Sequence, residues 1–251
     1  MSNKYKLEGE SRGISIGGIG RFFSLLLILF IGIFSVYSIQ NWNSEKENQK
    51  QESMYLDQLL KESQSNYEGL TDDLILRNER LSLMKFLMEN QNRSVGTDTL
   101  RMAIRQLMVN DLFLSNENLF QYLITTGDLN FINSLEIRSK ISELTNSVKE
   151  ISWKQTVEQR LIEEKIETYL IDEGVISLLE TLSNSDQINT SQQQVDRIIR
   201  VLLNDRKFVD LVYLRYSRLN DVINSEMALA SNLRQLMELL NFEIQTIEAN
   251  R

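Results

Sequence analysis

The sequence predicts an all-α protein, in which a single N-terminal transmembrane helix continues into an elongated antiparallel bundle of three long helices plus short connecting helices. Three observations support this fold class. An uncharged apolar run lies near the N-terminus, from Phe22 to Ile39. Beyond residue 40 the chain contains no proline and only four glycines, and therefore few of the residues that end helices and form turns. Apolar residues in this part recur every three or four positions, which is the spacing of one helix face.

The apolar run is long enough for a membrane-spanning helix. A helix of about 18 residues, rising about 1.5 Å per residue, spans about 27 Å, close to the hydrocarbon thickness of a bilayer. Arg21 at one end and Tyr37 and Trp42 at the other are the predicted membrane-interface anchors. A signal peptide that is cleaved near Ile39 is the alternative, and the lengths of the run and of the preceding tail disfavour it.

The membrane helix divides the chain into three parts. Residues 1–20 are predicted to be a flexible cytoplasmic tail, 21–40 the transmembrane helix and 41–251 the helical bundle domain. Basic residues near the two ends of the run predict its orientation. Four precede or begin it and two follow it, namely Lys4, Lys6, Arg12 and Arg21 against Lys46 and Lys50. Because basic flanks favour the cytoplasmic side, the large domain is expected outside the cytoplasm.

The composition disfavours several classes of function. The chain has no cysteine and no histidine, which removes disulfides, thiolate nucleophiles, histidine triads and the commonest metal ligands. Chemistry by carboxylates alone would need two acids to converge in a cleft, and no spacing in the sequence indicates that. We therefore expect no enzyme activity and no cofactor. The net charge of -8 disfavours nucleic acid as a partner, because binding a polyanion needs a basic surface.

The first long helix of the bundle is predicted from about residue 45 to residue 92. The residues expected to face other helices, here called its seam, are Leu56, Leu59, Ser63, Tyr67, Leu70, Leu74, Arg77, Leu81, Met84 and Met88. Ser63 and Arg77 are the polar members. One interpretation of Arg77 is a buried interaction site. The simpler one is that Arg77 snorkels to solvent or pairs with a nearby carboxylate at the edge of the bundle.

Two short helices are predicted between the first and second long helices, at residues 99–110 and 116–126. Gly127 supplies the left-handed residue that ends the second of them. Asp128 follows directly. We regard both as candidates for a partner contact or a structural motif.

The start of the second long helix has a capping signature. Asn133 is placed to cap the helix, and Glu136 to reach back to the amide of the cap. Ile132 and Ile137 flank this box at the spacing of a hydrophobic staple. Asn133 and Glu136 complete the first group of candidate residues.

The second long helix is predicted over residues 134–182. Its seam weakens at residues 152–160, where only Trp153 and Val157 are apolar, and a change in helix winding would absorb the slip. An acidic run follows, made of Glu163, Glu164, Glu167, Asp172 and Glu173. Carboxylates at helical spacing favour a solvated face over the alternative, a site for a hard cation.

The third long helix is predicted over residues 205–250, after a short helix that begins near Val195. Asn204 and Asp205 are placed to cap it. Tyr213 and Tyr216 lie among arginines on this helix, where stacking on Arg215 or Arg218 would be favourable. These two tyrosines form a second candidate contact group, and a position at the rim of the bundle would explain them about as well.

The three long helices have similar lengths of roughly 70 Å, which favours side-by-side antiparallel packing. The two short helices would then lie at the end far from the membrane. Residues 183–204 would return the chain to the membrane-proximal end.

Several local motifs resemble an uncharacterised family of single-pass inner-membrane proteins of Gram-negative bacteria. These are the Ile31-Gly32-Ile33 segment with Gln40 and Asn41-Trp42-Asn43, the segment from Thr126 to Arg138, and Phe208 to Leu219. The resemblance implies an inner-membrane anchor with a periplasmic domain, and it implies no activity. The family's Gly-Glu pair at the start of the membrane helix is replaced here by Gly20-Arg21.

These observations favour two functions. The first is a non-enzymatic, membrane-anchored periplasmic scaffold or accessory subunit of an envelope complex, whose partners are the lipid bilayer and another membrane or envelope protein or a second copy of the chain. The alternative is a periplasmic sensor that binds a ligand between helices, near the polar break around Trp153, and signals through a partner membrane protein.

Overall fold

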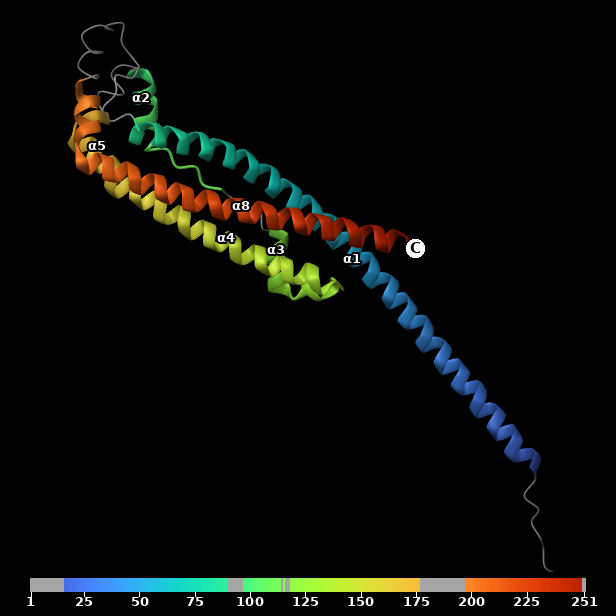
Figure 1. The fold of residues 1–251 in the computed structure, drawn as a ribbon. Helices are drawn as coiled ribbons and strands as arrows, with labels where there is room; N and C mark the ends of the chain where they lie inside the picture. Colours follow the sequence, from blue (N-terminus) through green and yellow to red (C-terminus); the bar gives the residue numbers. More distant parts are fainter. Residues whose placement is uncertain (1–15, 90–96, 114, 116–117, 177–196, 250–251) are drawn as a thin grey trace, which may run out of the picture. The chain divides into compact units, whose positions relative to one another are not determined.

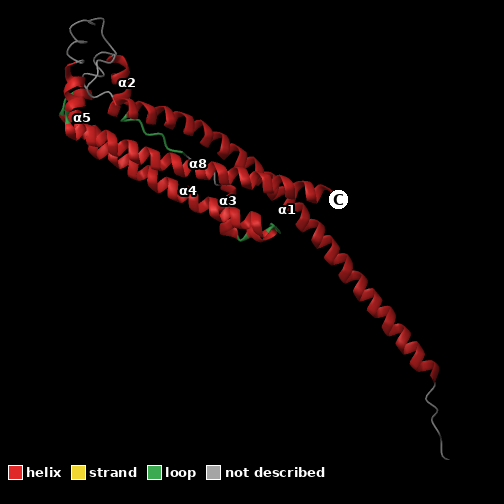
Figure 2. Ribbon diagram, in the orientation of Figure 1, coloured by secondary structure: helices red, strands yellow, loops and turns green. Residues whose placement is uncertain are grey.

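The computed structural model describes residues 16–89, 97–113, 115, 118–176 and 197–249, and for residues 16–45 the description covers the backbone alone. These residues form helices and loops, without a strand (Figure 2). The all-α prediction is therefore confirmed. The chain divides into two compact units, Met1–Gln51 and Glu52–Arg251.

The first unit contains the beginning of helix α1 (Ile16–Glu89). The predicted membrane segment, residues 21–40, has a helical backbone, whereas the side chains of the predicted anchors Arg21, Tyr37 and Trp42 lie outside the described residues. Within the part of the chain that is described, no helix was found to combine the length and the apolar character that a membrane crossing requires. Residues 1–15 of the predicted tail lie outside the described residues, and the helix begins before the predicted boundary at residue 20.

The second unit contains the rest of α1 and the remaining described elements (Figure 1). Their bounds are α2 Thr97–Gln106, α3 Asn118–Thr126, the 3-10 turn Asp128–Phe131, α4 Leu135–Leu161, a π-helical turn Ile162–Glu167, α5 Thr168–Asp172 and α8 Arg206–Ala249. Residues 197–204 are helical as well.

Two apolar cores stabilise this unit. The first core joins α1 to α2, α5 and α8 through residues that include Met84, Leu87, Ile104, Leu170 and Phe208. The second core joins α1 to α3, α4 and α8 through residues that include Leu59, Leu70, Leu123, Ile141 and Leu236. Burial of these side chains provides most of the stability, because isolated helices of this kind gain little from propensity.

The order of the cores along each helix gives the helix directions. Both α1 and α4 run from the second core to the first, whereas α8 runs from the first to the second. Helix α8 is therefore antiparallel to the other two, and α1 and α4 are parallel. The prediction that α1 and α4 are antiparallel was wrong, because the chain between α2 and α3 carries it from one core to the other. Residues 199–203 lie in the first core, as do Leu170 and Val175, so the described residues on both sides of 177–196 belong to the same core.

The seam of α1 differs from the prediction at four positions. Tyr67, Leu81 and Met88 are partly buried at the edges of the cores, and the residue directly before each of them, Asn66, Arg80 or Leu87, is buried instead. In these three cases the buried position lies one residue before the predicted one. Helical periodicity identifies the face of a helix that is buried, and neighbouring residues at the edge of that face can exchange places. Leu74 is partly buried as well.

The second long helix is interrupted twice. The π-helical turn Ile162–Glu167 inserts an extra residue, and the hydroxyl of Thr168 donates a hydrogen bond to the carbonyl of Glu163 over 3.4 Å. The predicted change in winding is confirmed, directly after the weak stretch at residues 152–160. Gly174, at a φ of 67°, then interrupts the run that was predicted to continue to residue 182, and residues 175 and 176 are helical again. Residues 177–196 lie outside the described part.

The capping prediction for α4 was wrong by one residue. Ser134 is the cap, and its hydroxyl accepts a hydrogen bond from the amide of Ile137 over 3.3 Å. Asn133 is bound to Glu52 on α1 and is not available for capping. At α8 the prediction is confirmed for Asp205, whose carboxylate accepts a hydrogen bond from the amide of Lys207 over 2.7 Å.

Candidate functional site

A layer of buried charged side chains separates the two apolar cores. It consists of Arg77 and Arg80 on α1, Glu158 on α4, and Arg215 and Glu226 on α8, and we call these five residues the charge layer. Each is between 0% and 4% exposed. Charged side chains are almost never fully buried unless they are paired, so this layer is the most unusual feature of the bundle interior.

Glu158 lies between two arginines of the other two helices. One carboxylate oxygen pairs with Nη1 of Arg215. The other lies 3.6 Å from Nη1 of Arg77. All three helices of the bundle therefore meet at this carboxylate.

Glu226 is the second carboxylate that pairs with Arg77. Its Oε2 atom lies 3.1 Å from Nε of Arg77, and its Oε1 atom accepts a hydrogen bond from Nε2 of Gln155 over 3.1 Å. Gln155 lies on α4, is 3% exposed and adds a neutral donor to the layer. Both carboxylates thus bind α1 through the same arginine.

The segment after α2 supplies the remaining partners of the arginines. The carbonyl of Val109 accepts a hydrogen bond from Nη2 of Arg215 over 2.9 Å, and that of Asp111 accepts one from Arg77. The Asp111 carboxylate lies 2.5 Å from Nη2 of Arg80. Few backbone hydrogen bonds are described for residues 107–113. The three arginines therefore attach this segment to α1 and α8.

Burial changes the acid-base properties of two members of the layer. It raises the pKa of Glu226 to about 7, although the charge of Arg77 opposes the rise. It also lowers the pKa of Arg215 to about 9, and the nearby charges of Arg80 and Arg77 lower it further. The pKa of Glu226 therefore lies close to neutral pH.

The sequence contained a signal for these residues. Buried positions on α8 follow an unbroken spacing of three and four, and Arg215 and Glu226 both occupy it; the series is Phe208, Val212, Arg215, Leu219, Val222, Glu226, Leu229 and Leu233. Glu158 likewise follows Ile151 by seven residues. Of the five residues in the charge layer, Arg77 alone was predicted to lie on a seam, and its pairing with a carboxylate is confirmed. The pair lies at the centre of the bundle and not at its edge.

The first group of predicted site residues is brought together near the start of α4. Gly127 has a φ of 81°, as its predicted left-handed role requires. The Asp128 carboxylate accepts a hydrogen bond from the hydroxyl of Tyr55 over 3.1 Å. The backbone amide and the side-chain amide of Asn133 each donate to the buried carboxylate of Glu52 over 2.6 Å.

These contacts attach the turn between α3 and α4 to α1. Glu136 is exposed on the first turn of α4 and takes no part in them. The group is therefore a structural motif that joins helices, with Glu52 and Tyr55 as the members that sequence reasoning missed.

The second predicted group does not form one site. Tyr213 is 53% exposed, whereas Tyr216 packs against the first core. Arg215 points into the charge layer, and Arg218 lies 4.0 Å from Asp221. The expected stacking is not observed among the described residues, where the cation over a ring is Lys207 on Tyr169.

The acidic run on the π-helical turn and α5 lies mostly in solvent. Among its five members Glu167 alone is partly buried. No group of acidic side chains suited to a metal ion occurs in the residues that the structure describes. The solvated interpretation agrees with this exposure.

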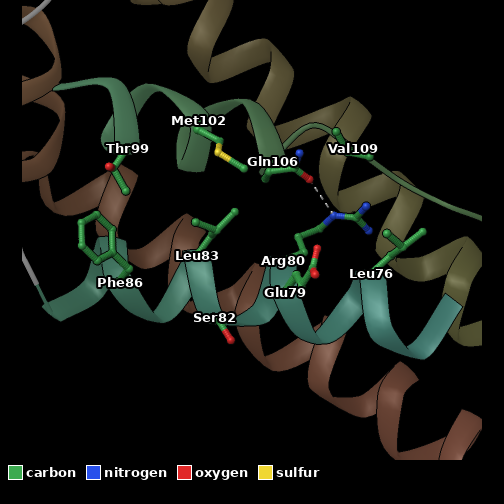
Figure 3. A pocket seen from close by; sticks show the side chains of 10 residues that line it. All are labelled: Leu76, Glu79, Arg80, Ser82, Leu83, Phe86, Thr99, Met102, Gln106 and Val109. Atoms are coloured by element: carbon green, nitrogen blue, oxygen red, sulfur yellow. Dashed lines mark hydrogen bonds between the residues drawn. The ribbon is translucent and has the colours of Figure 1, made fainter. Parts of the chain in front are cut away.

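A pocket of about 620 Å³ lies between α1 and α2 (Figure 3). Apolar side chains form most of its wall, namely Leu76, Leu83, Phe86, Met102 and Val109, and its polar members include Arg80 and Gln106. The sensor hypothesis placed a pocket near Trp153. That residue is 64% exposed on α4 and does not line this pocket.

Comparisons with known proteins give no relative. No family model, no curated protein and no solved structure matches the chain.

Proposed function

We propose that this chain is a membrane-anchored, non-enzymatic scaffold or accessory subunit, which acts through helix-mediated contacts with another protein of a bacterial envelope complex. The N-terminus would be cytoplasmic, residues 21–40 would cross the inner membrane, and the bundle would lie in the periplasm. The partner would be a membrane or envelope protein or a second copy of the chain.

The anchor is supported by sequence and backbone together. The run from Phe22 to Ile39 contains no charged residue, and the backbone from Ile16 to Glu89 is helical without interruption. A helix satisfies all its backbone hydrogen bonds internally, which is the condition for crossing a bilayer.

The contact role depends on one observation: large apolar side chains are exposed on the surface of the bundle, although several charged side chains are buried inside it. Leu135 and Trp153 on α4 and Phe242 on α8 are between 64% and 74% exposed. Exposed aromatic side chains are the residues that most often dominate binding energy when a partner covers them.

Localisation is tested on intact cells. The full chain should remain in the membrane pellet after alkaline carbonate extraction, and protease should digest the bundle in spheroplasts but not in intact cells. A chain found free in the periplasm, cleaved after Ser38, would contradict the anchor.

The contact role is tested by photo-cross-linking in living cells. A benzophenone amino acid at Trp153 should give one discrete adduct, with a second copy or with another envelope protein. The control is the same amino acid at Glu163, which is exposed on the π-helical turn and should give a weaker adduct. Equal adducts at both positions, or none at either, would argue against a specific contact at α4.

A ligand-binding sensor is the second candidate. The observation that favours it is the pocket between α1 and α2, whose volume lies within the range of about 300–1,000 Å³ typical of small-molecule sites.

A further inference from the structure

The pocket between α1 and α2 is open to solvent on one side and has an apolar part, here called the chamber, and a polar section. Phe86, Leu83 and Met102 come together in one part of it, with Thr99 at the side of Phe86 (Figure 3). Arg80 and Gln106 form the polar section, where Nε of Arg80 donates a hydrogen bond to Oε1 of Gln106 over 3.2 Å. A ligand that fills this space needs an apolar body and one polar end.

Arg80 has hydrogen-bonding capacity that the described residues do not use. Its Nε atom is bound to Gln106 and its Nη2 atom to Asp111, whereas Nη1 is buried and has no hydrogen-bond partner. The side chain is 4% exposed and lines the pocket wall. A buried donor without a partner is unfavourable, and a ligand acceptor in the pocket would satisfy it.

The positive charge of Arg80 itself favours an anionic acceptor over a neutral one, because charge-assisted hydrogen bonds are stronger. The Asp111 carboxylate already pairs with Nη2 of Arg80. Arg77 and Arg215 add positive charge nearby, since, after burial, the charges of Arg80 and Arg77 both contribute to the lowered pKa of Arg215. Glu79 also lines the pocket, but it is exposed, so water and salt screen its charge more than that of buried groups. Guanidinium groups also fit carboxylates by geometry.

We propose that this pocket binds a small monocarboxylate with a short aliphatic body, whose carboxylate accepts a hydrogen bond from Arg80 and whose chain lies among Leu83, Phe86 and Met102. The inference deepens the second candidate function by naming its ligand class. It does not depend on the scaffold proposal, because binding can be measured without any partner.

Octanoate is the probe, and equilibrium dialysis against the full-length chain in lipid nanodiscs is the measurement. We expect saturable binding of one octanoate per chain above the level of empty nanodiscs. Octanamide, which has the same chain and no charge, should bind about tenfold more weakly or worse, because it loses the charge-assisted hydrogen bond. Equal binding of the two compounds would overturn the assignment of the carboxylate.

Two variants locate the site. Met102→Trp should fill the chamber and weaken octanoate binding by at least about tenfold. Its matched control is Met227→Trp on α8, because Met102 and Met227 are 55% and 49% exposed and only Met102 lines the pocket. The control should bind octanoate as the wild type does. Unchanged octanoate binding in Met102→Trp would overturn the proposal. An absence of saturable binding in the wild type would overturn it too, and this is the result expected if bilayer acyl chains or a partner occupy the pocket.

Arg80→Gln separates the carboxylate from the apolar body. This variant should reduce octanoate binding to the level of octanamide and leave octanamide binding unchanged. Circular dichroism establishes that the variant folds, and the Met102 variants decide the question if it does not. Octanoate that still binds better than octanamide in folded Arg80→Gln would overturn the role of Arg80. A bound ligand without any effect on a partner protein would contradict the sensor function alone.

Discussion

The charge layer and the two apolar cores beside it use the same three helices in different ways. In the cores, exchanges between apolar side chains of equal volume cost less than about 1.5 kcal/mol. In the charge layer each group depends on a particular partner, because a buried charge that loses its partner costs about 3 to 5 kcal/mol. We therefore expect the cores to supply most of the stability and the charge layer to distinguish one alignment of α1, α4 and α8 from others.

Removal of Arg77 should have the largest effect. Arg77→Met keeps much of the volume but leaves the carboxylates of Glu158 and Glu226 without this cation. We expect the free energy of unfolding to fall by about 3 to 5 kcal/mol. Urea unfolding of the full-length chain in nanodiscs, followed by circular dichroism, measures it.

The control for this variant replaces four of the five members of the charge layer and keeps Arg80, which is paired with Asp111. Arg77→Met, Glu158→Leu, Arg215→Met and Glu226→Leu together should be close to the wild type in stability, because no unpaired charge remains among these four positions. Distances between spin labels on α1 and α8 should then show more than one alignment of the helices. If the fourfold variant kept a single native alignment of the helices, the charge layer would not be what determines that alignment.

A cavity in the second core provides the comparison. Leu70 is fully buried there, and Leu70→Ala should lower the free energy of unfolding by about 2 to 5 kcal/mol without changing the helix alignment. The same unfolding and distance measurements apply. If this variant also gave several alignments, the difference between core and layer would not hold.

The stability of the charge layer should depend on pH, whereas that of the apolar cores should not. The pKa of Glu226 is raised by burial to about 7, so between its ordinary value and about 7 the folded chain holds a proton that the unfolded chain releases. The stabilisation is complete below the unfolded pKa and is lost as pH rises through the folded pKa. Relative to Glu226→Gln, the wild type should lose about 2 to 3 kcal/mol between about pH 4 and pH 8.

Urea unfolding of both chains across this pH range is the measurement. The Leu70→Ala variant should differ from the wild type by an amount that does not change with pH. A parallel pH profile for wild type and Glu226→Gln would contradict the raised pKa.

Two glycine substitutions should give the smallest effects, with opposite signs. Gly127→Ala forces a side chain into the left-handed region at a φ of 81° and should destabilise by about 1 kcal/mol. Gly69 lies inside α1 with open space around it, so Gly69→Ala should stabilise by about 0.5 to 1 kcal/mol. Thermal unfolding is sensitive enough to distinguish them. Effects of the same sign would mean that the local conformation at one of these positions is not as described.

The helices themselves could be predicted from the sequence, because the three- and four-residue spacing of apolar residues and the scarcity of turn residues are local signals. The direction of α4 could not be predicted. It depends on whether the connection from α1 turns back at once or runs along the bundle, and the hydrogen bonds that decide this join Arg77 and Arg215 to residues 109 and 111. Contacts between residues so far apart leave no periodic signal.

The cap of α4 shows the same limit on a smaller scale. Asn133 and Ser134 are both good capping residues, and local rules do not choose between them. The choice follows from Glu52, which lies 81 positions earlier and binds Asn133. The charge layer was partly accessible, since Arg215 and Glu226 occupy seam positions. Their partners were not, because a seam shows burial and not which carboxylate faces which cation.

The extra residue in the π-helical turn gives the chain a place where its length can change. Successive residues of an α-helix are rotated by about 100°, so a deletion within α4 would turn everything beyond it away from its neighbours. A deletion between Ile162 and Glu167 would instead convert the turn to an ordinary α-helix and leave Tyr169 and Leu170 facing the same neighbours. Natural variants of this protein that lack one residue between Ser134 and Asp172 should therefore lack it in the π-helical turn and not in α4.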